Sequence, residues 1–454
     1  MSTILPCSPQ IDLAGRLRIT RRRTLALCEP LSPEDMMVQS SPEASPAKWH
    51  LAHTAWFFES FILREFLPGY QLFHGDFPWL FNSYYQSFAA FPEKRLRASF
   101  SRPNLEAILR YREHVDEHLE RLLSQNPEPE ALRRIELGVN HEEQHQELLL
   151  TDILNAFFTN PLRPAYQAGH LGTGTDAPGL VRRGGETWES TNLAGASNPE
   201  ESKLSFIPFE GGLREIGHRG EGFCFDNELQ RHRVWLEPYA LASRLVTCGE
   251  FASFIADGGY RRPELWLSAG WDAVQSQQWR SPLYWSHADS QWCVFTLHGE
   301  QPLNALEFAP VSHVSYFEAD AYARWAGRRL ATEFEWEAAA EDQPPTSANL
   351  LDSGRLTPVP AAETVDDPAG AGASPRLQQQ FGDCWEWTAS AYLAYPGFKP
   401  LAGSLGEYNG KFMSGQMVLR GGSCVTPKAH IRASYRNFFP PETRWQFSGI
   451  RLAL

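Results

Sequence analysis

The sequence lacks any pair of closely spaced cysteines. Its seven cysteines are odd in number, scattered along 454 residues and nowhere arranged as Cys-x-x-Cys. This pattern favours reduced thiols over a disulfide framework, and it predicts a cytoplasmic protein. The seven are Cys7, Cys28, Cys224, Cys248, Cys293, Cys384 and Cys424.

Long apolar runs and an excess of basic charge are also missing. No stretch approaches the roughly 18 apolar residues of a membrane helix, and the N-terminal residues show no apolar secretory core. The sequence has 41 Lys and Arg against 54 Asp and Glu, a net charge of −13, which argues against a nucleic-acid surface. The short run Arg21–Arg23 is interpreted as a solvated helix face or turn. We therefore expect neither a membrane nor a nucleic acid as a partner.

The chain changes character once along its length. Residues 1–165 show long helical periodicities with few glycines, and their spacing allows about four helices in an antiparallel bundle. Residues 166–203 are rich in Gly, Thr, Ser, Asn and Pro, which indicates a linker or an extended crossover. Residues 204–454 are rich in Gly and Trp. We predict an α+β protein of two domains, because a chain of this length exceeds one typical core.

The second half combines short regular elements with much irregular backbone. Strand-like runs occur at 233–236 and 416–420, and short helices are predicted near 246–255 and 316–325. A Pro-, Ala- and Gly-rich stretch near 357–374 indicates an exposed insertion. We therefore expect a loop-rich α+β domain without internal repeats.

Two histidines stand one helical turn apart in the segment Asn-His-Glu-Glu-Gln-His-Gln-Glu. Positions i and i+4 share one face of a helix, so His141 and His145 could hold one metal ion. Imidazole suits zinc, iron, copper and nickel, and the pair therefore does not identify the metal. The aromatic helical stretch 49–59 carries His50 and His53, and bundles build core metal sites from imidazoles on facing helices. The alternative is a pair of solvated histidines on a polar helix.

The same residues also spell His-Glu-x-x-His, the zinc-protease motif. In that motif Glu142 would be the general base. A protease would have its third ligand further down the chain, whereas the candidate here lies upstream. A zinc metalloprotease stays open as an alternative from another enzyme class.

Five phrases of the second half resemble the formylglycine-generating-enzyme type of sulfatase-modifying domain, a loop-rich relative of the C-type lectin fold. The first half resembles a DinB-like four-helix bundle. Together, over nearly the whole chain, they are similar to the ergothioneine-biosynthesis sulfoxide synthases, whose relatives are the ovothiol sulfoxide synthases and the selenoneine synthases. The five phrases are residues 310–315, 327–337, 382–388, 420–423 and 449–451.

The resemblance implies a non-haem iron(II) centre and an oxygen-dependent reaction. It matches His53, His141 and His145 to three neutral iron ligands, with His50 as a neighbour one turn earlier. It also matches Gln144 to a glutamine that contacts the substrate imidazole. The implied reaction joins the imidazole C2 of hercynine, trimethylated histidine, to sulfur while the sulfur becomes a sulfoxide.

The same resemblance implies a proton donor in the run Phe-Asn-Ser-Tyr-Tyr-Gln. We expect Tyr85 to be the catalytic phenol and Tyr84 to support it. The alternative is that the two adjacent tyrosines are half-buried packing residues.

The C-terminal run 435–447 is expected to complete the substrate pocket. Asn437 and Phe438 match positions that hold the amino-acid end of hercynine in the family, and Phe439 extends the aromatic run. Aromatic faces are good partners for a quaternary ammonium group. Without the resemblance, this cluster would be interpreted as core.

One departure from the family concerns the sulfur donor. Residues 97–103, Arg-Ala-Ser-Phe-Ser-Arg-Pro, stand where the family usually has an Arg-Gly-Leu-Leu-Ser-Arg-Pro-like phrase. The segment lies beside the donor side of the family's site, so free cysteine, γ-glutamylcysteine and the selenosugar of selenoneine synthases all stay open. Arg95, Arg97 and Arg102 are candidate contacts for an anionic or hydroxyl group, although each alone is more typical of a surface arginine.

Two further alternatives are weaker. A formylglycine-generating oxidase would need a late pair of copper-binding cysteines, and only Cys424 follows the Arg-Gly-Gly-Ser turn. A lectin-like binding module with a vestigial bundle would have no reason to keep three histidines together. We expect a cytoplasmic, two-domain Fe(II) oxygenase whose substrates are hercynine, a thiol or selenosugar, and dioxygen, bound between the domains.

Overall fold

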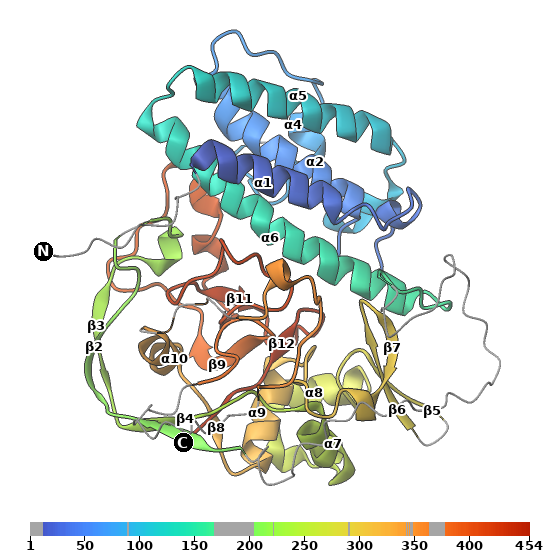
Figure 1. The fold of residues 1–454 in the computed structure, drawn as a ribbon, viewed down its shortest axis with the longest axis vertical. Coiled ribbons are helices and arrows are strands. Elements are labelled where there is room, and N and C mark those ends of the chain that lie inside the picture. The colour runs from blue at the N-terminus through green and yellow to red at the C-terminus, as the bar shows by residue number, and fades with distance from the viewer. Residues whose placement is uncertain are drawn as a thin grey trace, which may run out of the picture.

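The chain forms a helical part and a loop-rich part, which lie one above the other in the computed structural model (Figure 1). The structure describes residues 12–167, 204–362 and 377–454, apart from residues 89, 221, 289, 290, 342, 344, 346 and 347. The described strands all belong to the loop-rich part. Helix α6 (Pro129–Thr159), with 31 residues, runs along the boundary between the two parts.

The helical part contains the four long helices that the sequence predicts. Helix α5 begins after Asn104, whose side chain accepts a hydrogen bond from the backbone N–H of Ala107. Helix α6 begins with Pro129, which has no N–H to leave unsatisfied at that position. The elements are α1 (Leu13–Ala26), η1 (Asp35–Met37), α2 (Ala47–Phe58), η2 (Glu59–Leu63), α3 (Arg64–Phe66), α4 (Phe77–Leu80), η3 (Lys94–Ser99), α5 (Leu105–Ser124) and α6.

Helix α2 is buried on every side, which fixes the face that carries His53. All 12 of its residues are buried, as its aromatic sequence predicts. Gly138 of α6 permits a close approach of the two helices, because a Cβ there would lie 2.5 Å from the ring of Phe58. The approach brings the His141 face of α6 against α2.

The arginine run of α1 requires a correction. We expected Arg21–Arg23 to be solvated, but Arg21 is only 4% exposed. Its guanidinium donates to Asp116 of α5 at 2.6 Å and to Glu142 of α6 at 2.8 Å. A buried charge is tolerated only with such partners, and they come from residues about 95 and 121 positions away. Sequence spacing gives no sign of them.

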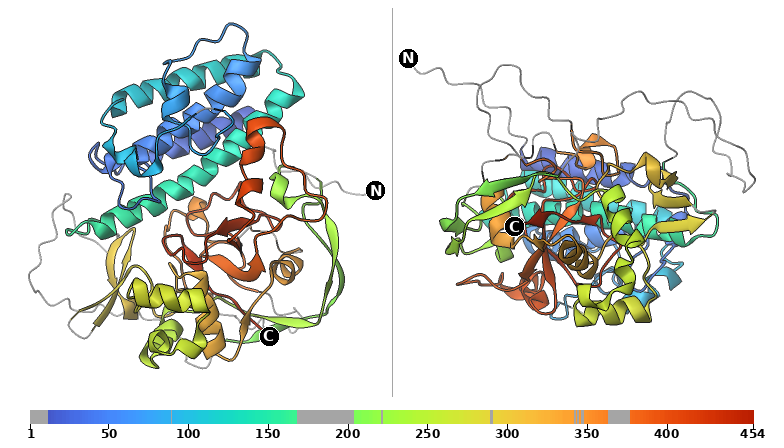
Figure 2. Two further views of the ribbon diagram at one scale, coloured as in Figure 1. Left: turned by 180° about the vertical axis from the view of Figure 1, so that it is seen from behind. Right: turned by 90° about the horizontal axis from the view of Figure 1, so that it is seen from below.

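Two four-stranded sheets lie at the centre of the loop-rich part. Their strand orders are β1-β4-β13-β8 and β11-β10-β9-β12, and the β9–β12 pair alone is parallel among these neighbours. The β2–β3 ribbon and the β5-β6-β7 sheet flank them on opposite sides (Figures 1 and 2). The strands are β1 (Phe206–Phe209), β2 (Gly212–Ile216), β3 (His232–Leu236), β4 (Tyr239–Ala242), β5 (Trp285–Ala288), β6 (Gln291–Thr296), β7 (Gly299–Pro302), β8 (Arg329–Leu330), β9 (Trp385–Ala391), β10 (Met417–Arg420), β11 (Asn437–Phe439), β12 (Ser448–Gly449) and β13 (Leu452–Ala453).

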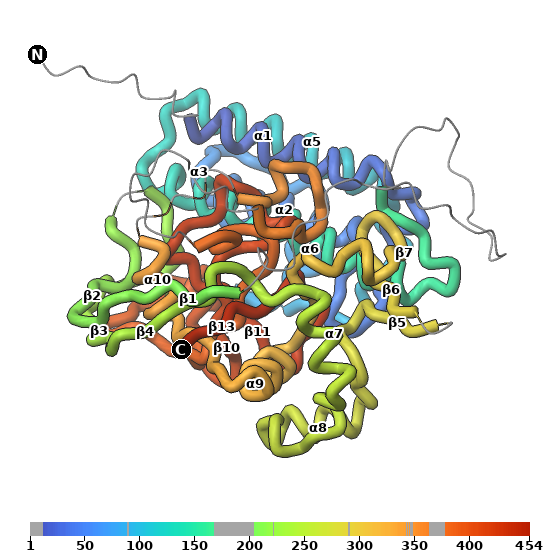
Figure 3. The backbone as a smooth tube through the Cα atoms, turned by 60° about the horizontal axis from the view of Figure 1, so that its bottom comes forward, coloured from blue at the N-terminus to red at the C-terminus, as the bar shows by residue number. Residues whose placement is uncertain are grey.

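The short helices of this part include two that were predicted and two that were not. Helices α7 and α9 confirm the helices expected near 246–255 and 316–325, whereas α8 and α10 were missed. Figure 3 shows α8 and α9 on the side away from α1 and α5. The elements are α7 (Cys248–Ala256), α8 (Ser268–Ser276), α9 (Tyr316–Trp325), α10 (Glu333–Ala340), η4 (Asp226–Glu228), η5 (Gly259–Arg261), η6 (Pro263–Leu265), η7 (Leu303–Ala305), η8 (Leu351–Ser353), η9 (Gly403–Glu407) and η10 (Gly410–Phe412).

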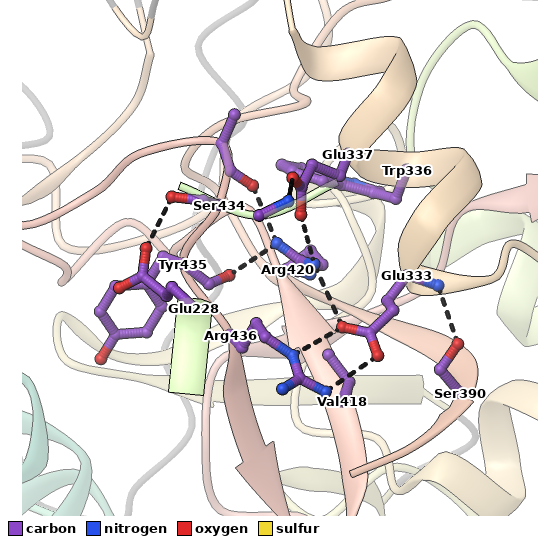
Figure 4. Close-up of polar contacts among 12 residues, drawn as sticks. Glu228, Glu333, Trp336, Glu337, Ser390, Val418, Arg420, Ser434, Tyr435 and Arg436 are labelled. Carbon is purple, nitrogen blue, oxygen red and sulfur yellow. Dashed lines mark hydrogen bonds and ion pairs between the residues drawn. The ribbon is translucent and has the colours of Figure 1, made fainter. Parts of the chain in front are cut away.

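A buried ion-pair network fixes β10 and the start of β11 (Figure 4). Arg420 lies 3.1 Å from Glu333 and 2.8 Å from Glu337, and Arg436 lies 2.8 Å from Glu333. All four side chains are buried. These ion pairs favour one backbone arrangement, because a shift of β10 or β11 would separate buried opposite charges.

The predicted boundaries near residues 165 and 204 stay predictions. Most of the expected linker, 166–203, and of the expected insertion, 357–374, lies outside the described residues. Among the described helices, none combines the length and the apolar character needed to cross a membrane. Six of the seven cysteines are described, and all six are free thiols.

Candidate metal centre

Helices α2 and α6 bring together the three histidines that the sequence singled out. One ligand atom from each of His53, His141 and His145 lies within 4.8 Å of the other two. The side chains are at most 9% exposed, so the cluster is shielded from bulk water. The predicted convergence of one imidazole from α2 on a His-x-x-x-His pair of α6 is therefore confirmed.

Hydrogen bonds fix the tautomers of two of these rings. His53 Nδ1 lies 2.6 Å from the carbonyl oxygen of Phe81, which can only accept, so Nε2 keeps its lone pair. His145 Nδ1 lies 2.8 Å from His50 Nδ1, and His50 Nε2 lies 3.0 Å from Asp152. The Asp152 carboxylate accepts a hydrogen bond from His50 Nε2–H, so the neutral His50 ring has a lone pair on Nδ1. His50 Nδ1 therefore accepts a hydrogen bond from His145 Nδ1–H, and the lone pair of His145 Nε2 is also free.

The three rings are held as neutral imidazoles. Burial, followed by the neighbouring histidines, lowers the pKa of His53 and of His145 well below the usual value. Burial lowers the pKa of His141 to about 3. His141 Nδ1 is itself a buried nitrogen without a partner among the described residues. Three neutral nitrogen donors without a carboxylate form a site suited to a transition metal.

Aromatic side chains close the centre on the bundle side. Trp49 and Trp56 both stack on the His53 ring, at centroid distances of 4.4 Å and 5.1 Å. Phe57 packs against His141 at 4.5 Å. These rings hold the imidazoles of His53 and His141 in place.

Tyr85 lies one aromatic layer away from His53. Its fully buried ring packs against Trp56 at 5.6 Å and stacks on Tyr84 at 4.6 Å. Its hydroxyl group has no partner in hydrogen-bond geometry among the described residues, and the Tyr84 phenol is the polar group beside it. Burial, and then the phenols of Tyr84 and Tyr408, raise the pKa of Tyr85 well above its usual value. The group therefore stays protonated and free to donate.

Tyr408 is a site residue that the sequence analysis missed. Its buried ring lies 5.7 Å from the His141 ring and 6.3 Å from the Tyr84 ring. It follows η9 in the loop-rich part, so phenols from both parts gather beside the ligands. The surrounding sequence, Gly-Glu-Tyr-Asn-Gly, carries no pattern that would identify it.

The same turn holds the tyrosine loop in place. Glu407 accepts hydrogen bonds from the backbone N–H groups of Gln86 at 3.1 Å and Ser87 at 2.9 Å. Lys411 donates to the carbonyl oxygen of Tyr84. The position of the tyrosine pair thus depends on the loop-rich part as much as on the bundle.

The predicted hercynine-binding residues lie where α6 contacts the loop-rich part. Gln144 Nε2 lies 2.6 Å from the hydroxyl of Tyr435. Phe438 stacks on Tyr392 at 4.0 Å and faces Phe412, whose ring lies 5.4 Å from that of Tyr84.

Asn437 and Phe439 flank Phe438 on β11 and are both half-buried. Asn437 uses its side-chain oxygen to accept from the backbone N–H of Phe438 at 2.9 Å. The contacts described for Asn437 and Phe439 do not reach the three histidines, so their predicted role in binding is untested.

Arg97 is buried beside the centre, contrary to the behaviour of a surface arginine. Its guanidinium lies 3.5 Å from the centroid of the Trp49 ring and donates to the hydroxyl groups of Ser45 and Ser83. It forms no ion pair with the described carboxylates, and burial, which outweighs the attraction of Asp152, lowers its pKa to about 9. A buried cation with neutral partners is suited to binding an anion.

The other two arginines of this segment lie outside the centre. Arg102 is exposed and donates to the carbonyl of Ser101, its neighbour in the chain. Arg95 is exposed and pairs with Glu93. The structure thus brings Arg97 to the site but not Arg102.

The placement of Glu142 argues against the protease alternative. Its carboxylate faces α1 and α5, where it pairs with Arg21 and Arg112 at 2.8 Å and 2.7 Å and accepts from Thr24. Burial would raise its pKa, but the two arginines outweigh burial and hold the value at about 2. A general base must reach a water molecule on the metal, and this group is committed elsewhere.

We expect Glu142→Gln to lower the free energy of unfolding at pH 7 by about 3 kcal/mol, because two buried arginines lose their shared anion. The folded pKa of about 2 lies below the reference value of 4.5. This stability is therefore fully present above pH 4.5 and is lost as the pH falls through 2. Urea unfolding of both proteins at several pH values should show a difference in the free energy of unfolding that is constant above pH 5 and becomes smaller below it. A stability difference that increased on acidification would contradict this role of Glu142.

The fold and the site together define a class of protein. Residues 16–150 match the DinB superfamily, and residues 193–454 match the Sulfatase-modifying factor enzyme 1-like domain. Both matches confirm the two halves expected from the sequence. The chain is a two-domain protein in which a DinB-type bundle contributes a three-histidine centre and a sulfatase-modifying-type domain covers it.

Two curated relatives match over nearly their whole length. The hercynine oxygenase of Mycolicibacterium smegmatis is 31% identical, covering 97% of this chain and 98% of that protein. The hercynine oxygenase of Mycobacterium tuberculosis is 32% identical, covering 98% and 99%. The chain belongs to the hercynine oxygenase family and is an oxygenase, which confirms the family expected from the sequence.

Likeness to formylglycine-generating enzymes is more limited. The enzyme of Streptomyces coelicolor is 35% identical over 130 residues, which cover 27% of this chain and 41% of that protein. The full-length relatives therefore outweigh both the formylglycine-generating alternative and the non-catalytic lectin-like alternative.

Proposed function

We propose that this chain is an iron(II)-dependent synthase that joins the imidazole C2 of hercynine to the sulfur of a thiol. The supporting observation is a buried three-histidine centre in a chain whose full-length relatives are hercynine oxygenases. The reaction balances with one dioxygen. The C2–H and S–H bonds break and a C–S bond forms, one oxygen atom becomes the sulfoxide oxygen, and the other leaves as water.

The donor set fits ferrous iron. His53, His141 and His145 would hold the ion, and the hydrogen bonds to Phe81 and His50 already leave the Nε2 lone pairs of His53 and His145 available to it. When bound, iron supplies the redox chemistry with dioxygen. Neutral ligands leave the charge of the ion uncompensated, which favours binding of an anionic thiolate beside it.

Hercynine would lie between α6 and β11. Gln144 would contact the imidazole, and Asn437 would bind the carboxylate end. Phe438 and Phe439 offer aromatic faces, each worth about 0.5–2 kcal/mol to a trimethylammonium group. The aromatic surface from Tyr84 through Phe412 to Phe438 is continuous, which supports this placement.

Tyr85 would donate a proton during turnover, with Tyr84 stacked on it as support. A buried hydroxyl group without a partner is uncommon, because it costs free energy to desolvate. The position of the Tyr85 hydroxyl group near the three histidines is explained if a substrate-derived oxygen accepts a hydrogen bond from it during turnover.

The sulfur donor would carry a carboxylate. Arg97 provides a buried guanidinium that forms no direct ion pair with the described carboxylates, stacked on the tryptophan that itself stacks on His53. Cysteine and γ-glutamylcysteine both supply a carboxylate, whereas a selenosugar does not. We therefore favour a thiol donor, and we assign no contact to the exposed Arg102.

An anaerobic-to-aerobic assay tests the proposal. Protein loaded with Fe(II) is mixed with hercynine and one of cysteine, γ-glutamylcysteine or selenosugar, and products are identified by mass after oxygen is admitted. We expect a product equal to the two substrates plus one oxygen atom and minus two hydrogen atoms with a thiol. Turnover with selenosugar alone would assign a carbon–selenium bond instead. Absence of product with every donor, although iron is bound, would refute the proposed reaction.

We expect Asp152→Ala to weaken Fe(II) binding by about 10- to 100-fold, because His50 then loses the carboxylate that orients it toward His145. Competition with a chromogenic chelator under anaerobic conditions measures this affinity without turnover. Glu130→Gln, an exposed carboxylate of the same helix, serves as the control. Equal affinities for the two variants would show that Asp152 does not orient the ligand.

A further inference from the structure

The carboxamide of Asn140 can take only one orientation. Its Nδ2 donates to the carbonyl oxygen of Glu136 at 2.9 Å, and its Oδ1 accepts from the guanidinium of Arg16 at 3.1 Å. A carbonyl cannot donate and a guanidinium cannot accept, so the reversed amide would lose both bonds. His430 Nδ1 lies 3.2 Å from the same Oδ1 and must therefore carry a proton.

That proton sets the direction of the next bond. Glu143 Oε2, 3.7 Å from His430 Nδ1, also favours an N–H on this side of the ring. Burial, followed by Arg432 and Arg16, lowers the pKa of His430 well below its usual value, so the ring is neutral. A neutral ring with its proton on Nδ1 accepts at Nε2. The Tyr435 hydroxyl, 3.0 Å from Nε2, therefore donates to it.

Tyr435 in turn fixes the amide of Gln144. A hydroxyl group has one hydrogen, and Tyr435 uses it to donate a hydrogen bond to His430. Tyr435 can therefore only accept a hydrogen bond from Gln144. Gln144 Nε2 lies 2.6 Å from this oxygen and is the donor. The carbonyl Oε1 of Gln144 is then the group left over, and it has no hydrogen-bond partner within the part of the chain that the structure describes.

We propose that Asn140, His430 and Tyr435 are positioning residues that hold Gln144 with a carbonyl oxygen facing the substrate, so that the site selects an azole ring carrying an N–H. Gln144 shares a helix face with His141 and precedes His145, which places this oxygen beside the centre. An imidazole bound through its N–H presents its other nitrogen with a free lone pair. This inference rests on the proposed function and extends it to the tautomer of hercynine and to the residues that select it.

Two variants interrupt this series of hydrogen bonds at different residues. Tyr435→Phe removes the acceptor of the Gln144 amide, and His430→Leu removes the acceptor of the Tyr435 hydroxyl, which can then turn toward Gln144. Calorimetric titration of the iron-loaded protein compares hercynine with hercynine methylated on the ring nitrogen. We expect the wild type to bind hercynine about 10-fold more tightly than the methylated ring, because the methylated ring covers the Gln144 carbonyl without donating a hydrogen bond to it. Either variant should reduce this preference to about twofold.

A second background separates positioning from packing. In a Gln144→Ala background, Tyr435→Phe should change hercynine affinity by less than about twofold, compared with about 10-fold when Gln144 is present. Equal losses in both backgrounds, or an unchanged preference for hercynine in both variants that still bind it, would overturn this inference alone. Wild-type protein that binds no hercynine would overturn the proposed function and this inference with it.

Discussion

We expect His145→Ala to reduce bound iron to less than a tenth of the wild-type content and to lower turnover by about 1,000-fold or more. The variant leaves two imidazoles, and a lost ligand should cost more than the 10- to 100-fold effect of a lost orienting group. His145 also links the centre to His50 and Asp152, so its removal frees that pair as well. Iron content after anaerobic loading, measured by mass spectrometry, reports binding independently of turnover.

His118→Ala is a matched control for this prediction. His118 is a half-buried histidine of the bundle, and its ring contacts the carbonyl of His114 on α5 rather than the centre. The control should retain iron, activity and melting temperature close to those of the wild type. If His145→Ala kept a full complement of iron while folded, the three histidines would not share one ion and the proposed function would lose its basis.

The spacing of the ligand pair was predictable from the sequence, and the choice of its partner was only partly so. A helix through 141–145 places both imidazoles on one face whatever surrounds it. Helix α2 offers His50 and His53 three residues apart, and both are buried. Their different roles come from the Phe81 carbonyl and from Asp152, which no local pattern connects to them. Here the family resemblance supplied what periodicity could not.

The groups that complete the site come from distant segments. Tyr408 reaches His141 only because the loop-rich part docks on α6, and His430 meets Asn140 across 290 positions of sequence. Arg21 is a related case, since the solvated appearance of an arginine run is reversed by a carboxylate 121 positions away. Such pairings are set by tertiary packing, and single-sequence periodicity carries no information on them.

The two missed helices show where local signals were present and where they were not. Helix α10 begins with a capping box, in which Thr332 and Glu335 exchange side-chain-to-backbone hydrogen bonds, and the spacing of these residues is visible in the sequence. Helix α8 follows Leu267 without a side-chain cap. The first could have been predicted from Thr-x-x-Glu, whereas the second is stabilised mainly by its packing, for example the contact of Gly270 with Phe317.

We expect Tyr85→Phe to lower the rate of carbon–sulfur bond formation by about 100-fold or more, the usual effect of losing a positioned proton donor. Oxygen consumption should persist, with simple thiol oxidation becoming the main outcome, because binding of the thiol and of iron does not depend on this hydroxyl. The free energy of unfolding should stay within about 0.5 kcal/mol of the wild type or rise, since the removed hydroxyl has no partner to lose. Product ratios by mass and urea unfolding measure the two effects separately.

Tyr111→Phe provides the opposite combination. Tyr111 is equally buried, but its hydroxyl donates to Glu59 at 2.7 Å, so its loss should cost about 1–3 kcal/mol of stability and leave the product ratio unchanged. A catalytic phenol and a structural phenol are thus distinguished by which quantity moves. If Tyr85→Phe destabilised the fold and preserved the product ratio, Tyr85 would be a packing residue. The proton would then have to come from another phenol of the cluster, of which Tyr408 lies nearest the His141 ring.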